Sequence, residues 1–328
     1  MKVLVTGSAG FIGGHLVRAL ADRGYSVVAT DLGGSGGPGE APSFRPCDIT
    51  DKEGLNRLFA ESQPEALIHL AARTDLLGET IEDYAANTVG VENLIDAIRN
   101  TRTVRRAVFT SSQLVCRVGY VPQHDQDYQP NTIYGQSKVL TEQIVRGTNG
   151  GGAEWCLVRP TTVWGPGMNK HYQSFFRLIR QGRYFHVGRR PLYKTYGYVG
   201  NVVEQYIRLL EAPSGSLREV FYVADYEPLA LREWADALQR EFGVKPIRTV
   251  SEPLARALAR TGDLLNAVGV RRFPFNSFRL NNILTEYRYD MSPTRAVCGE
   301  MTHTFEEGVR ETAAWFSAVD SQSSSNGK

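Results

Sequence analysis

Short, wholly apolar runs alternate with amphipathic stretches through the first half of this chain of 328 residues. Runs of this kind suit strands of a parallel sheet, because helices cover such strands on both faces. The predicted strands are Lys2–Thr6, Ser26–Thr30, Ala66–His69, Arg106–Ser111, Trp155–Arg159 and Val220–Ala224. The predicted helices are Phe11–Asp22, Lys52–Glu61, Glu79–Arg99 and Tyr134–Arg146. This alternation of strand and helix predicts a doubly wound α/β sheet.

The pattern changes after about residue 160. A turn rich in glycine and proline, Trp164–Gly167, leads into an aromatic and basic stretch, and the chain after Leu229 is mostly helical in pattern. A chain of this length is near the size at which a second lobe forms. The polar C-terminal residues have little apolar surface to bury and should be disordered. The expected division is 1–163 with 195–226 for the sheet domain, 164–194 with 227–318 for a smaller, mostly helical substrate lobe, and 319–328 for a disordered tail.

Composition and charge set few limits on the partners. The chain has 37 Lys and Arg against 35 Asp and Glu, a formal net charge of +2, which gives no reason to expect nucleic acid or a membrane surface as a partner. No apolar stretch approaches the ~20 residues of a membrane span, and no signal peptide is evident. The four cysteines lack CxxC spacing, which predicts no metal site and a reducing compartment. We therefore expect a cytoplasmic protein.

The clearest motif follows the first predicted strand. Gly7, Gly10 and Gly13 have G-x-x-G-x-x-G spacing and open the first predicted helix. The first glycine permits a tight turn, the second lets the backbone approach a pyrophosphate, and the third allows the helix to pack closely on the sheet. Asp31 ends the second strand, where an acid accepts hydrogen bonds from the adenosine ribose and repels a 2′-phosphate. The glycine motif together with Asp31 predicts NAD rather than NADP as the cofactor.

Tyr134 and Lys138 lie four residues apart, on one face of a predicted helix. A free tyrosine, with a pKa near ~10, is a poor base at neutral pH, and a neighbouring ammonium favours its phenolate. Tyr134 is therefore a candidate to exchange a proton with a substrate hydroxyl while hydride passes to or from a nicotinamide. Lys138 is a candidate to bind the nicotinamide ribose.

Taken in order, the motifs TGSAGFIG, Asp31, CDITD, HLAAR and YAANTVGVENLIDA resemble those of the extended short-chain dehydrogenase/reductase family, the NAD-dependent epimerases and dehydratases. YDMSPTRAV and EEGVRETAAWF are similar to its closing segments, so the resemblance covers nearly the whole chain. It implies a Rossmann-type sheet domain with bound NAD. The implied cofactor-binding residues are Gly7, Gly10, Phe11, Ile12, Gly13, Asp31, Asp48, Ile49, Leu70, Ala71, Ala72, Asn87, Tyr134, Lys138 and Pro160.

The family's Phe-x-Ser-Ser pattern implies that Ser112 joins Tyr134 and Lys138 as the third catalytic residue. Gln113 follows it where dehydratases of the family carry an acidic pair, which argues against elimination of water. Thr162 and Lys194 stand at positions of diphosphate-binding and phosphate-binding residues, and cations between His171 and Lys194 could bind a pyrophosphate. The substrate-binding candidates are Arg73, Thr110, Gln113, Thr162 and Lys194.

The resemblance implies an enzyme, with more than one reaction open. The favoured activity is a nucleotide-sugar epimerase, most simply at carbon 4, because transient oxidation by bound NAD gives no net redox change. The alternative is a dehydrogenase or keto-reductase acting on a nucleotide sugar or on a 3β-hydroxysteroid-like alcohol. A non-catalytic NAD sensor is disfavoured because all three catalytic residues are present. Relatives pair through two helices, here Glu79–Arg99 and Tyr134–Arg146, so we expect a homodimer.

Overall fold

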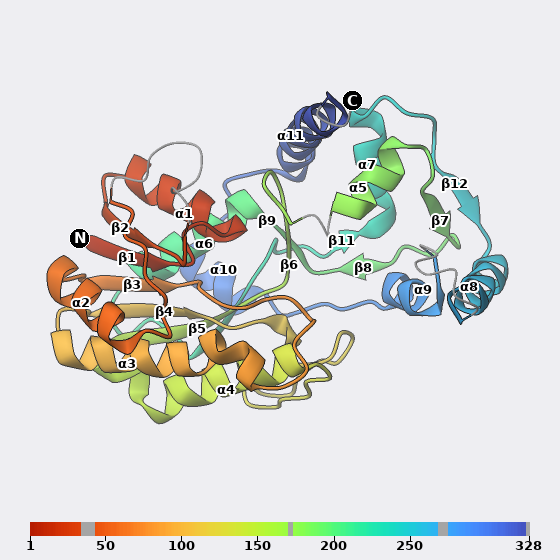
Figure 1. Ribbon diagram of the computed structural model, residues 1–328. Helices are drawn as coiled ribbons and strands as arrows, with labels where there is room; N and C mark the ends of the chain where they lie inside the picture. Colours follow the sequence, from red (N-terminus) through yellow and green to blue (C-terminus); the bar gives the residue numbers. More distant parts are fainter. Residues whose placement is uncertain (34–42, 170–172, 268–274, 326–328) are drawn as a thin grey trace. The chain divides into compact units, whose positions relative to one another are not determined.

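Six parallel strands form the central sheet of the computed structural model, which describes residues 1–33, 43–169, 173–267 and 275–325 (Figure 1). Their order across the sheet is β10-β5-β4-β3-β1-β2. The strands are β1 (Lys2–Thr6), β2 (Ser26–Thr30), β3 (Ala66–His69), β4 (Arg106–Thr110), β5 (Glu154–Pro160) and β10 (Val220–Val223). The order reverses beside β1, which has β2 on one side and β3 on the other. Ligands of open α/β sheets bind at the carboxyl ends of the strands at such a point.

Helices cover both faces of this sheet, as the doubly apolar strands require. In Figure 1, α1 and α6 lie on one face and α2, α3 and α4 on the other. The apolar side chains between the second layer and the sheet form a continuous core that includes Leu4, Leu67, Phe109 and Leu157. These helices are α1 (Phe11–Asp22), α2 (Lys52–Ser62), α3 (Val89–Thr101), α4 (Ile133–Gly147) and α6 (Val199–Glu211).

One predicted helix is divided. The sequence predicts a single helix over Glu79–Arg99, but the structure has the 3₁₀ helix η1 (Glu82–Asn87) followed by α3. Thr88 between them has φ −122° and ψ −79°, outside the helical region. The carboxylate of Asp83 accepts hydrogen bonds from the backbone N–H groups of Glu79 and Thr80, at 2.9 and 3.0 Å, which holds the start of the segment as a turn. Helical periodicity alone does not reveal such local side-chain to backbone bonds.

The chain divides into two compact units. The first consists of Met1–Val163, Gly197–Tyr226 and Tyr289–Thr302, and the second of Trp164–Tyr196, Glu227–Arg288 and His303–Lys328. Besides the sheet and its helices, the first unit contains η2 (Gln113–Val115), η3 (Asn149–Gly152) and α10 (Ser292–Cys298). The short strands β6 (Thr162–Trp164) and β9 (Tyr196–Tyr198) pair with each other and carry the chain from one unit to the next.

The second unit is mostly helical, with two small sheets. Strand β7 pairs with β12 in parallel, and β8 pairs with β11 antiparallel. Helices α8 and α9 pack against one another, as do α7 and α11 (Figure 1). The elements are α5 (Gln173–Arg180), β7 (Phe185–Val187), β8 (Tyr193–Lys194), β11 (Leu229–Ala230), α7 (Leu231–Glu241), β12 (Arg248–Val250), α8 (Glu252–Ala267), α9 (Ser277–Leu284) and α11 (Phe305–Ser325).

The C-terminal part of the chain differs from the expectation in two places. Tyr289–Thr302, predicted to belong to the lobe, is part of the first unit, because Thr294 donates a 2.6 Å hydrogen bond to the carbonyl of Tyr222. The prediction of a disordered tail over 319–328 does not hold for 319–325, which continue α11; an ion pair of 3.0 Å between Arg180 and Asp320 holds that helix. No helix within the described residues is long and apolar enough to cross a membrane.

Candidate active site

Two positions, one in the turn after β1 and one in the first turn of α1, accept only glycine. Gly7 has φ +72°, and a Cβ there would lie 2.5 Å from the backbone nitrogen of Ala71, after β3. A Cβ on Gly13 would lie 2.0 Å from the carbonyl oxygen of Gly7. Both positions therefore exclude side chains, and the backbone surface that results is open to a ligand at the switch point of the sheet.

Helix α1 begins at this turn, and no capping side chain or acidic residue compensates the partial positive charge of its N-terminus. Gly10 is the N-cap, so no side chain caps the helix, and no acidic residue lies in the first turn. Phe11 and Ile12 begin the helix, and the backbone N–H groups of a first helical turn have no partner within the helix. Such an N-terminus attracts a phosphate through these N–H groups and through the helix dipole.

Asp31 lies beside the glycine turn, as the sequence predicts. One of its carboxylate oxygens accepts a hydrogen bond of 2.9 Å from the backbone N–H of Ala9, and the other accepts one of 2.8 Å from Leu32. These bonds fix the carboxylate at the end of β2. It is held where an acid accepts hydrogen bonds from the ribose hydroxyls of a dinucleotide whose phosphates lie on α1.

The loop after β3 closes the other side of this site. Leu70 donates its backbone N–H to the carbonyl of Thr6 (3.1 Å), and Ala71 donates to the hydroxyl of Thr6 (3.3 Å). Ala72 follows in the same loop, so all three predicted residues border the end of β1. Because these bonds use only backbone N–H groups of the loop, the side chains stay available to line a bound cofactor.

Asn87 is completely buried and joins this loop to α4. Its side-chain oxygen accepts from the backbone N–H of Arg73 (2.9 Å), and its amide donates to the carbonyl of Arg73 (3.0 Å) and the hydroxyl of Ser137 in α4 (2.9 Å). These bonds hold the β3 loop against α4.

Asp48 and Ile49 lie in the segment that leads from β2 to α2. The carboxylate of Asp48 accepts from the backbone N–H and the hydroxyl of Thr50, at 2.8 and 2.7 Å. The side chain of Ile49 is 5% exposed and lies against Gly90, so only its backbone can border an adenine. Asn93 of α3 holds this backbone through a 3.0 Å bond to the Ile49 carbonyl.

Tyr134 and Lys138 lie on the inner face of α4, both buried. The ammonium of Lys138 donates a 2.7 Å hydrogen bond to the carbonyl of Thr110 at the end of β4. Burial lowers the pKa of Lys138 to about 8, although the charge of Glu142 opposes the shift. Burial and the charge of Lys138 together lower the pKa of His69 to about 3, so His69 is neutral at physiological pH.

Ser112 reaches the first turn of α4 through a second close backbone approach. Its hydroxyl accepts a 3.1 Å hydrogen bond from the N–H of Leu114 and so caps η2. The carbonyl oxygen of Leu114 would lie 2.3 Å from a Cβ on Gly135, the residue after Tyr134. Glycine at 135 therefore lets the segment of Ser112 lie directly on the turn of Tyr134, which brings the three predicted catalytic residues into one region of the first unit.

Of three predicted substrate-binding residues in the first unit, Thr110 and Arg73 make side-chain hydrogen bonds within the protein, and the side-chain oxygen of Gln113 has no partner among the described residues. The hydroxyl of Thr110 lies 2.9 Å from that of Tyr206, a buried residue of α6, and is turned into the protein. The guanidinium of Arg73 donates to Asp75 at 2.8 Å. Gln113 is buried, and within the described residues its side-chain oxygen has no hydrogen-bond partner. Of the three, Gln113 has the acceptor best able to serve a ligand.

The sequence analysis did not predict a buried network of charged and polar side chains around Glu142 of α4. The carboxylate of Glu142, in α4, accepts hydrogen bonds from Ser111 (2.6 Å), Tyr128 (2.8 Å) and Arg159 of β5 (2.8 Å twice). Burial works against the charge of Arg159, but the carboxylate raises its pKa overall. Two signals could have indicated the network: Glu142 lies one turn after Lys138, and Arg159 interrupts an otherwise apolar strand.

The remaining predicted residues lie where the chain leaves the first unit and inside the second. Pro160 ends β5, and Thr162 begins β6 and is partly buried. Lys194 of β8 is buried, and its ammonium donates a 2.5 Å hydrogen bond to the carbonyl of Asn282 beside the ring of Tyr287. Burial lowers the pKa of Lys194 to about 8. To bind a phosphate, Lys194 must first give up this carbonyl.

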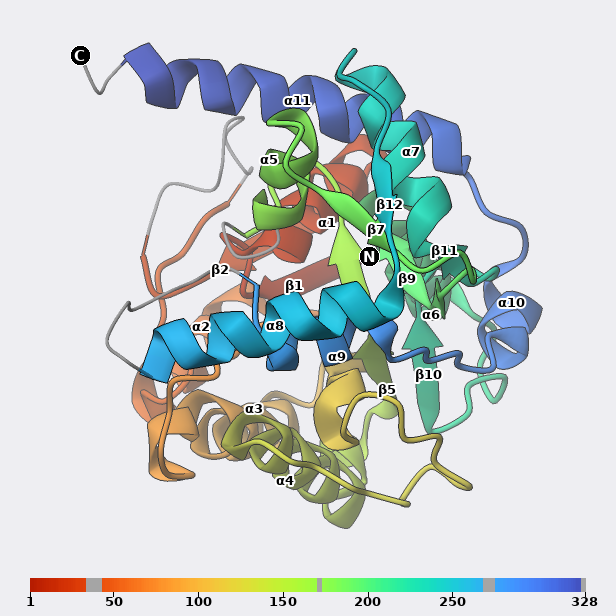
Figure 2. The ribbon, with the colours of Figure 1, turned by 90° about the vertical axis from the view of Figure 1, so that its right-hand side faces the viewer.

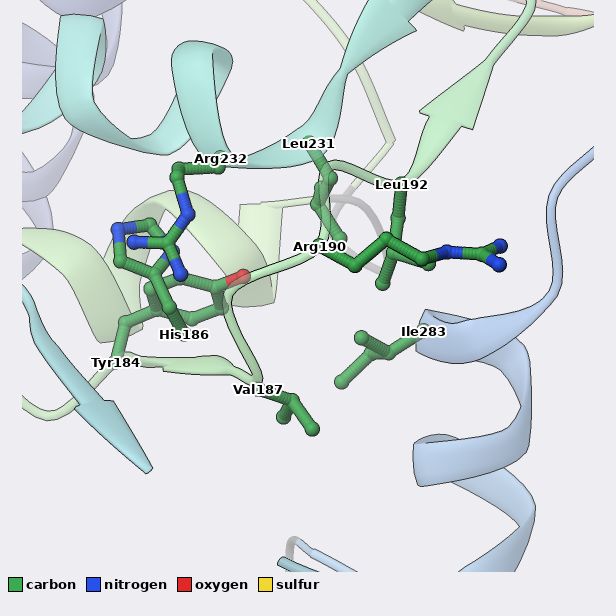
Figure 3. A pocket seen from close by; sticks show the side chains of 8 residues that line it. All are labelled: Tyr184, His186, Val187, Arg190, Leu192, Leu231, Arg232 and Ile283. Carbon is green, nitrogen blue, oxygen red and sulfur yellow. The ribbon is translucent and has the colours of Figure 1, made fainter. Parts of the chain in front are cut away.

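The second unit contains a pocket with one polar and one apolar side (Figure 3). Arg232 lies beside Tyr184 and His186, while the guanidinium of Arg190 points away from them. His186 is 2.9 Å from Asp236, and its pKa is nonetheless lowered by burial. The pocket is lined by Tyr184, His186, Val187, Arg190, Leu192, Leu231, Arg232 and Ile283. His171, at the start of the predicted cationic stretch, lies outside the described residues.

These residues fit NAD. The glycine surface, the open N-terminus of α1 and the fixed carboxylate of Asp31 match the pyrophosphate and a ribose without a 2′-phosphate. Residues 3–224 match the model of the NAD dependent epimerase/dehydratase family. That span covers the glycine turn, Asp31 and all three predicted catalytic residues.

Similar proteins include enzymes of two kinds. The 3 beta-hydroxysteroid dehydrogenase/Delta 5-->4-isomerase of Mycobacterium tuberculosis is 30% identical over 78% of this chain and 73% of its own. The N-acetyl-alpha-D-glucosaminyl-diphospho-ditrans,octacis-undecaprenol 4-epimerase of Escherichia coli is 24% identical over 95% and 94%. The UDP-glucose 4-epimerase of Thermus thermophilus, solved with NAD, superposes with a TM-score of 0.71 at 25% identity over 97% and 99%. The chain therefore belongs to the NAD dependent epimerase/dehydratase family, as an enzyme of the extended short-chain dehydrogenase/reductase type that uses NAD.

Proposed function

We propose that this enzyme is a nucleotide-sugar epimerase that inverts a hydroxyl, most simply at carbon 4. The observation that carries the proposal is the combination of a fixed Asp31 beside the glycine turn with Tyr134, Lys138 and Ser112 in one region of the first unit. An acid at that position favours NAD over NADPH, and NAD that stays bound suits a reaction without net redox change. The similarity to 4-epimerases over nearly the whole chain supports it.

The proposed mechanism assigns one role to each catalytic side chain. Tyr134 removes the proton of the substrate hydroxyl as the carbon that bears it loses a hydride, and later returns a proton to the same oxygen when that carbon regains the hydride. Ser112 donates its hydroxyl proton to the reacting oxygen, since its oxygen already accepts from Leu114. Lys138, anchored on the carbonyl of Thr110, keeps a positive charge near the tyrosine oxygen. NAD supplies the acceptor and donor of the hydride. Inversion requires that the ketone present its opposite face before the hydride returns to its carbon.

On the substrate side we propose Arg73, Thr110, Gln113, Thr162 and Lys194 as the residues nearest the sugar and its diphosphate. Gln113 has the strongest support, because its buried side-chain oxygen has no hydrogen-bond partner within the described residues and can accept from a sugar hydroxyl. Arg73 and Lys194 must exchange a present partner, Asp75 or the Asn282 carbonyl, for a phosphate oxygen. A charge-assisted bond to a phosphate is strong enough to drive such an exchange.

A second candidate activity is a dehydrogenase or keto-reductase on a 3β-hydroxysteroid-like alcohol. The Mycobacterium tuberculosis relative supports it, and so does the apolar side of the pocket in the second unit, formed by Val187, Leu192, Leu231 and Ile283. Four aliphatic side chains suit a ring system or an alkyl chain better than a sugar. Such a reaction consumes a coenzyme in each turnover, whereas the epimerase does not, so the two activities are separable in one assay.

We also propose that the enzyme is a homodimer formed through α3 and α4. These helices lie side by side on one face of the sheet (Figure 1). Val139 and Leu140 of α4 are only partly buried, so the face offers apolar surface to a second copy. Sedimentation velocity of the purified protein measures the state directly, and a purely monomeric protein would refute this part of the proposal.

The test of the activity is incubation with UDP-, GDP-, dTDP- and CDP-hexoses without added coenzyme, read by proton NMR of the sugar. A new epimer, without accumulation of NADH, is the expected result, and Tyr134→Phe serves as the inactive control. If no sugar is converted but sterols or keto-sugars turn over once coenzyme is added, the second candidate replaces the first.

A further inference from the structure

Helix α8 is packed on one side only. It lies beside α9 in both views of the molecule (Figures 1 and 2). Ala255, Ala259 and Gly262 are its buried residues. The two alanines share a small core with Leu280 of α9 and Val187 of β7. Because these residues are small, α8 sits close to its neighbours along one narrow line, and the rest of its circumference is solvent-exposed.

The exposed side of α8 is apolar. Leu254, Leu258 and Leu264 are 53, 43 and 64% exposed. At 100° per residue these positions, with Ala257 and Thr261, fall within an arc of about 120° whose centre lies about 130° around the helix from the packed line. No charged residue lies in that arc, although a helix face in contact with water normally carries charged residues. The outer face of α8 therefore has the composition of a buried surface.

Cationic side chains border this face. Arg256 and Arg260 lie on its edge and line a groove between α8 and α9, together with Ser277, Leu280 and Asn281. Arg256 is paired with Glu252 at 2.6 Å, whereas Arg260 forms no ion pair with any residue that the structure describes. The groove next to the leucines is therefore positively charged.

Helix α9 repeats this arrangement. Phe278 is 71% exposed, and Arg279 beside it has no ion-pair partner among the described residues. Asp263 of α8 is engaged with the start of α9, where its carboxylate accepts a 3.1 Å hydrogen bond from the backbone N–H of Ser277. An apolar strip with arginines along its edge is the pattern of a helix that lies in the plane of a membrane interface.

We propose that the outer face of α8 and α9 binds the surface of an anionic membrane, with the leucines and Phe278 among the acyl chains and Arg260 and Arg279 at the lipid phosphates. Charge complementarity decides for anionic lipid over a second copy of the chain, since two such faces would bring their arginines together. The sequence analysis expects no membrane partner because the net charge is only +2 and no apolar stretch has the length of a membrane span. Neither feature detects an apolar strip with arginines along its edge on one helix. This inference does not depend on the proposed reaction.

The test is sedimentation of the full chain with lipid vesicles. Phosphatidylcholine vesicles that contain phosphatidylglycerol should bind the protein, and pure phosphatidylcholine should bind it roughly tenfold more weakly. Leu254→Gln combined with Leu258→Gln should lower binding to the anionic vesicles by roughly tenfold or more, whereas Arg260→Gln with Arg279→Gln should abolish only the preference for them. Both positions of each pair are exposed, so folding should be unaffected; circular dichroism checks this.

The matched control is Leu76→Gln with Leu77→Gln, two leucines of the first unit that are 59 and 82% exposed; this variant should bind vesicles like the wild type. Equal loss in the control, or wild-type binding by the α8 leucine variant, overturns the proposal. Absence of vesicle binding by the wild type does so as well. If sedimentation velocity instead shows that the wild type is an oligomer and the α8 leucine variant a smaller species, the outer face of α8 joins copies of the chain. The membrane proposal is then wrong.

Discussion

Glu142 of α4 and Arg159 of β5 form a completely buried ion pair, joined by two hydrogen bonds of 2.8 Å. The same carboxylate accepts a hydrogen bond from the hydroxyl of Ser111, the residue before Ser112, which we propose as a catalytic residue. One charged pair therefore connects the helix of Tyr134 and Lys138 to two strands of the sheet. A pair so free of solvent holds its partners in one arrangement, because each charge is stable only beside the other.

Replacing Glu142 by Gln should destabilise the fold by about 3–5 kcal/mol, because it leaves the Arg159 charge buried without its carboxylate. Urea denaturation measures the loss. The control is Glu154→Gln, which breaks a pair with Arg106 whose carboxylate is 28% exposed; water can solvate that site, so the loss should be smaller. If both variants lose the same free energy of unfolding, the buried Glu142–Arg159 pair contributes no more to stability than the partly exposed Glu154–Arg106 pair.

Gly13→Ala should abolish NAD binding, because the new Cβ would lie 2.0 Å from the carbonyl oxygen of Gly7 and force the phosphate-binding turn to move. Gly14→Ala is the matched control on the same helix. Its Cβ would lie no nearer than 3.7 Å to any atom outside the helix, and alanine favours helices, so binding should persist and stability stay equal or rise. Calorimetric titration with NAD checks both, and loss of binding in the control would contradict this account.

Asp31→Asn should raise the affinity for NADP by roughly tenfold, about 1.4 kcal/mol, because it removes the charge that repels the 2′-phosphate. The amide can still accept from Ala9, which now donates to the carboxylate at 2.9 Å, so the turn should remain intact. Asp22→Asn, at the exposed end of α1, should leave both affinities unchanged. An NADP affinity that does not respond to Asp31→Asn would remove the basis for NAD selectivity.

The sequence predicts the sheet and the glycine turn after β1 well, because each signal there is local. The apolar runs of β1, β2 and β3 have the predicted bounds, since strands buried on both faces contain almost no polar residues. The glycine turn is predictable because backbone contacts of 2.0–2.5 Å leave no alternative to glycine at 7 and 13. Tyr134 and Lys138 follow from spacing on one helix.

What sequence reasoning missed depends on pairs of residues far apart in the chain. The amide of Asn87, a predicted cofactor-binding residue, donates hydrogen bonds to Arg73 and Ser137, fourteen and fifty positions away, and the sequence does not indicate these partners. The partnership of Glu142 with Arg159 likewise appears only when α4 lies on β5. The exposure of the α8 leucines was unpredictable for the same reason, because apolar periodicity does not say whether a partner covers the face.

Tyr134→Phe should lower kcat by about 10²–10⁴-fold or more, since the ring is retained and only the proton-transferring hydroxyl is lost. NAD affinity should change little, because the glycine turn and Asp31 are untouched. Tyr84→Phe is the control: its ring lies 6.0 Å from that of Tyr134, and its hydroxyl donates to the carbonyl of Asp75. That variant should lose some stability but keep most of its turnover. Unchanged turnover in Tyr134→Phe would exclude Tyr134 as the base.

The neutral His69 should make the protein sensitive to acid. Its folded-state pKa of about 3 lies below the ordinary 6.5 because of burial and the charge of Lys138, so between these values the unfolded chain binds more protons than the folded one. The stability it contributes is therefore fully present above about pH 6.5 and falls as the pH drops toward 3, by roughly 3 kcal/mol at about pH 4.5. His69→Asn can keep the hydrogen bond to the hydroxyl of Thr6, now 2.8 Å from Nδ1, but does not titrate.

Urea denaturation of both proteins at about pH 7.5 and about pH 4.5 isolates the effect, because every other titrating group is shared. The wild type should lose more stability than the variant, and identical losses would mean that His69 is already charged in the folded protein.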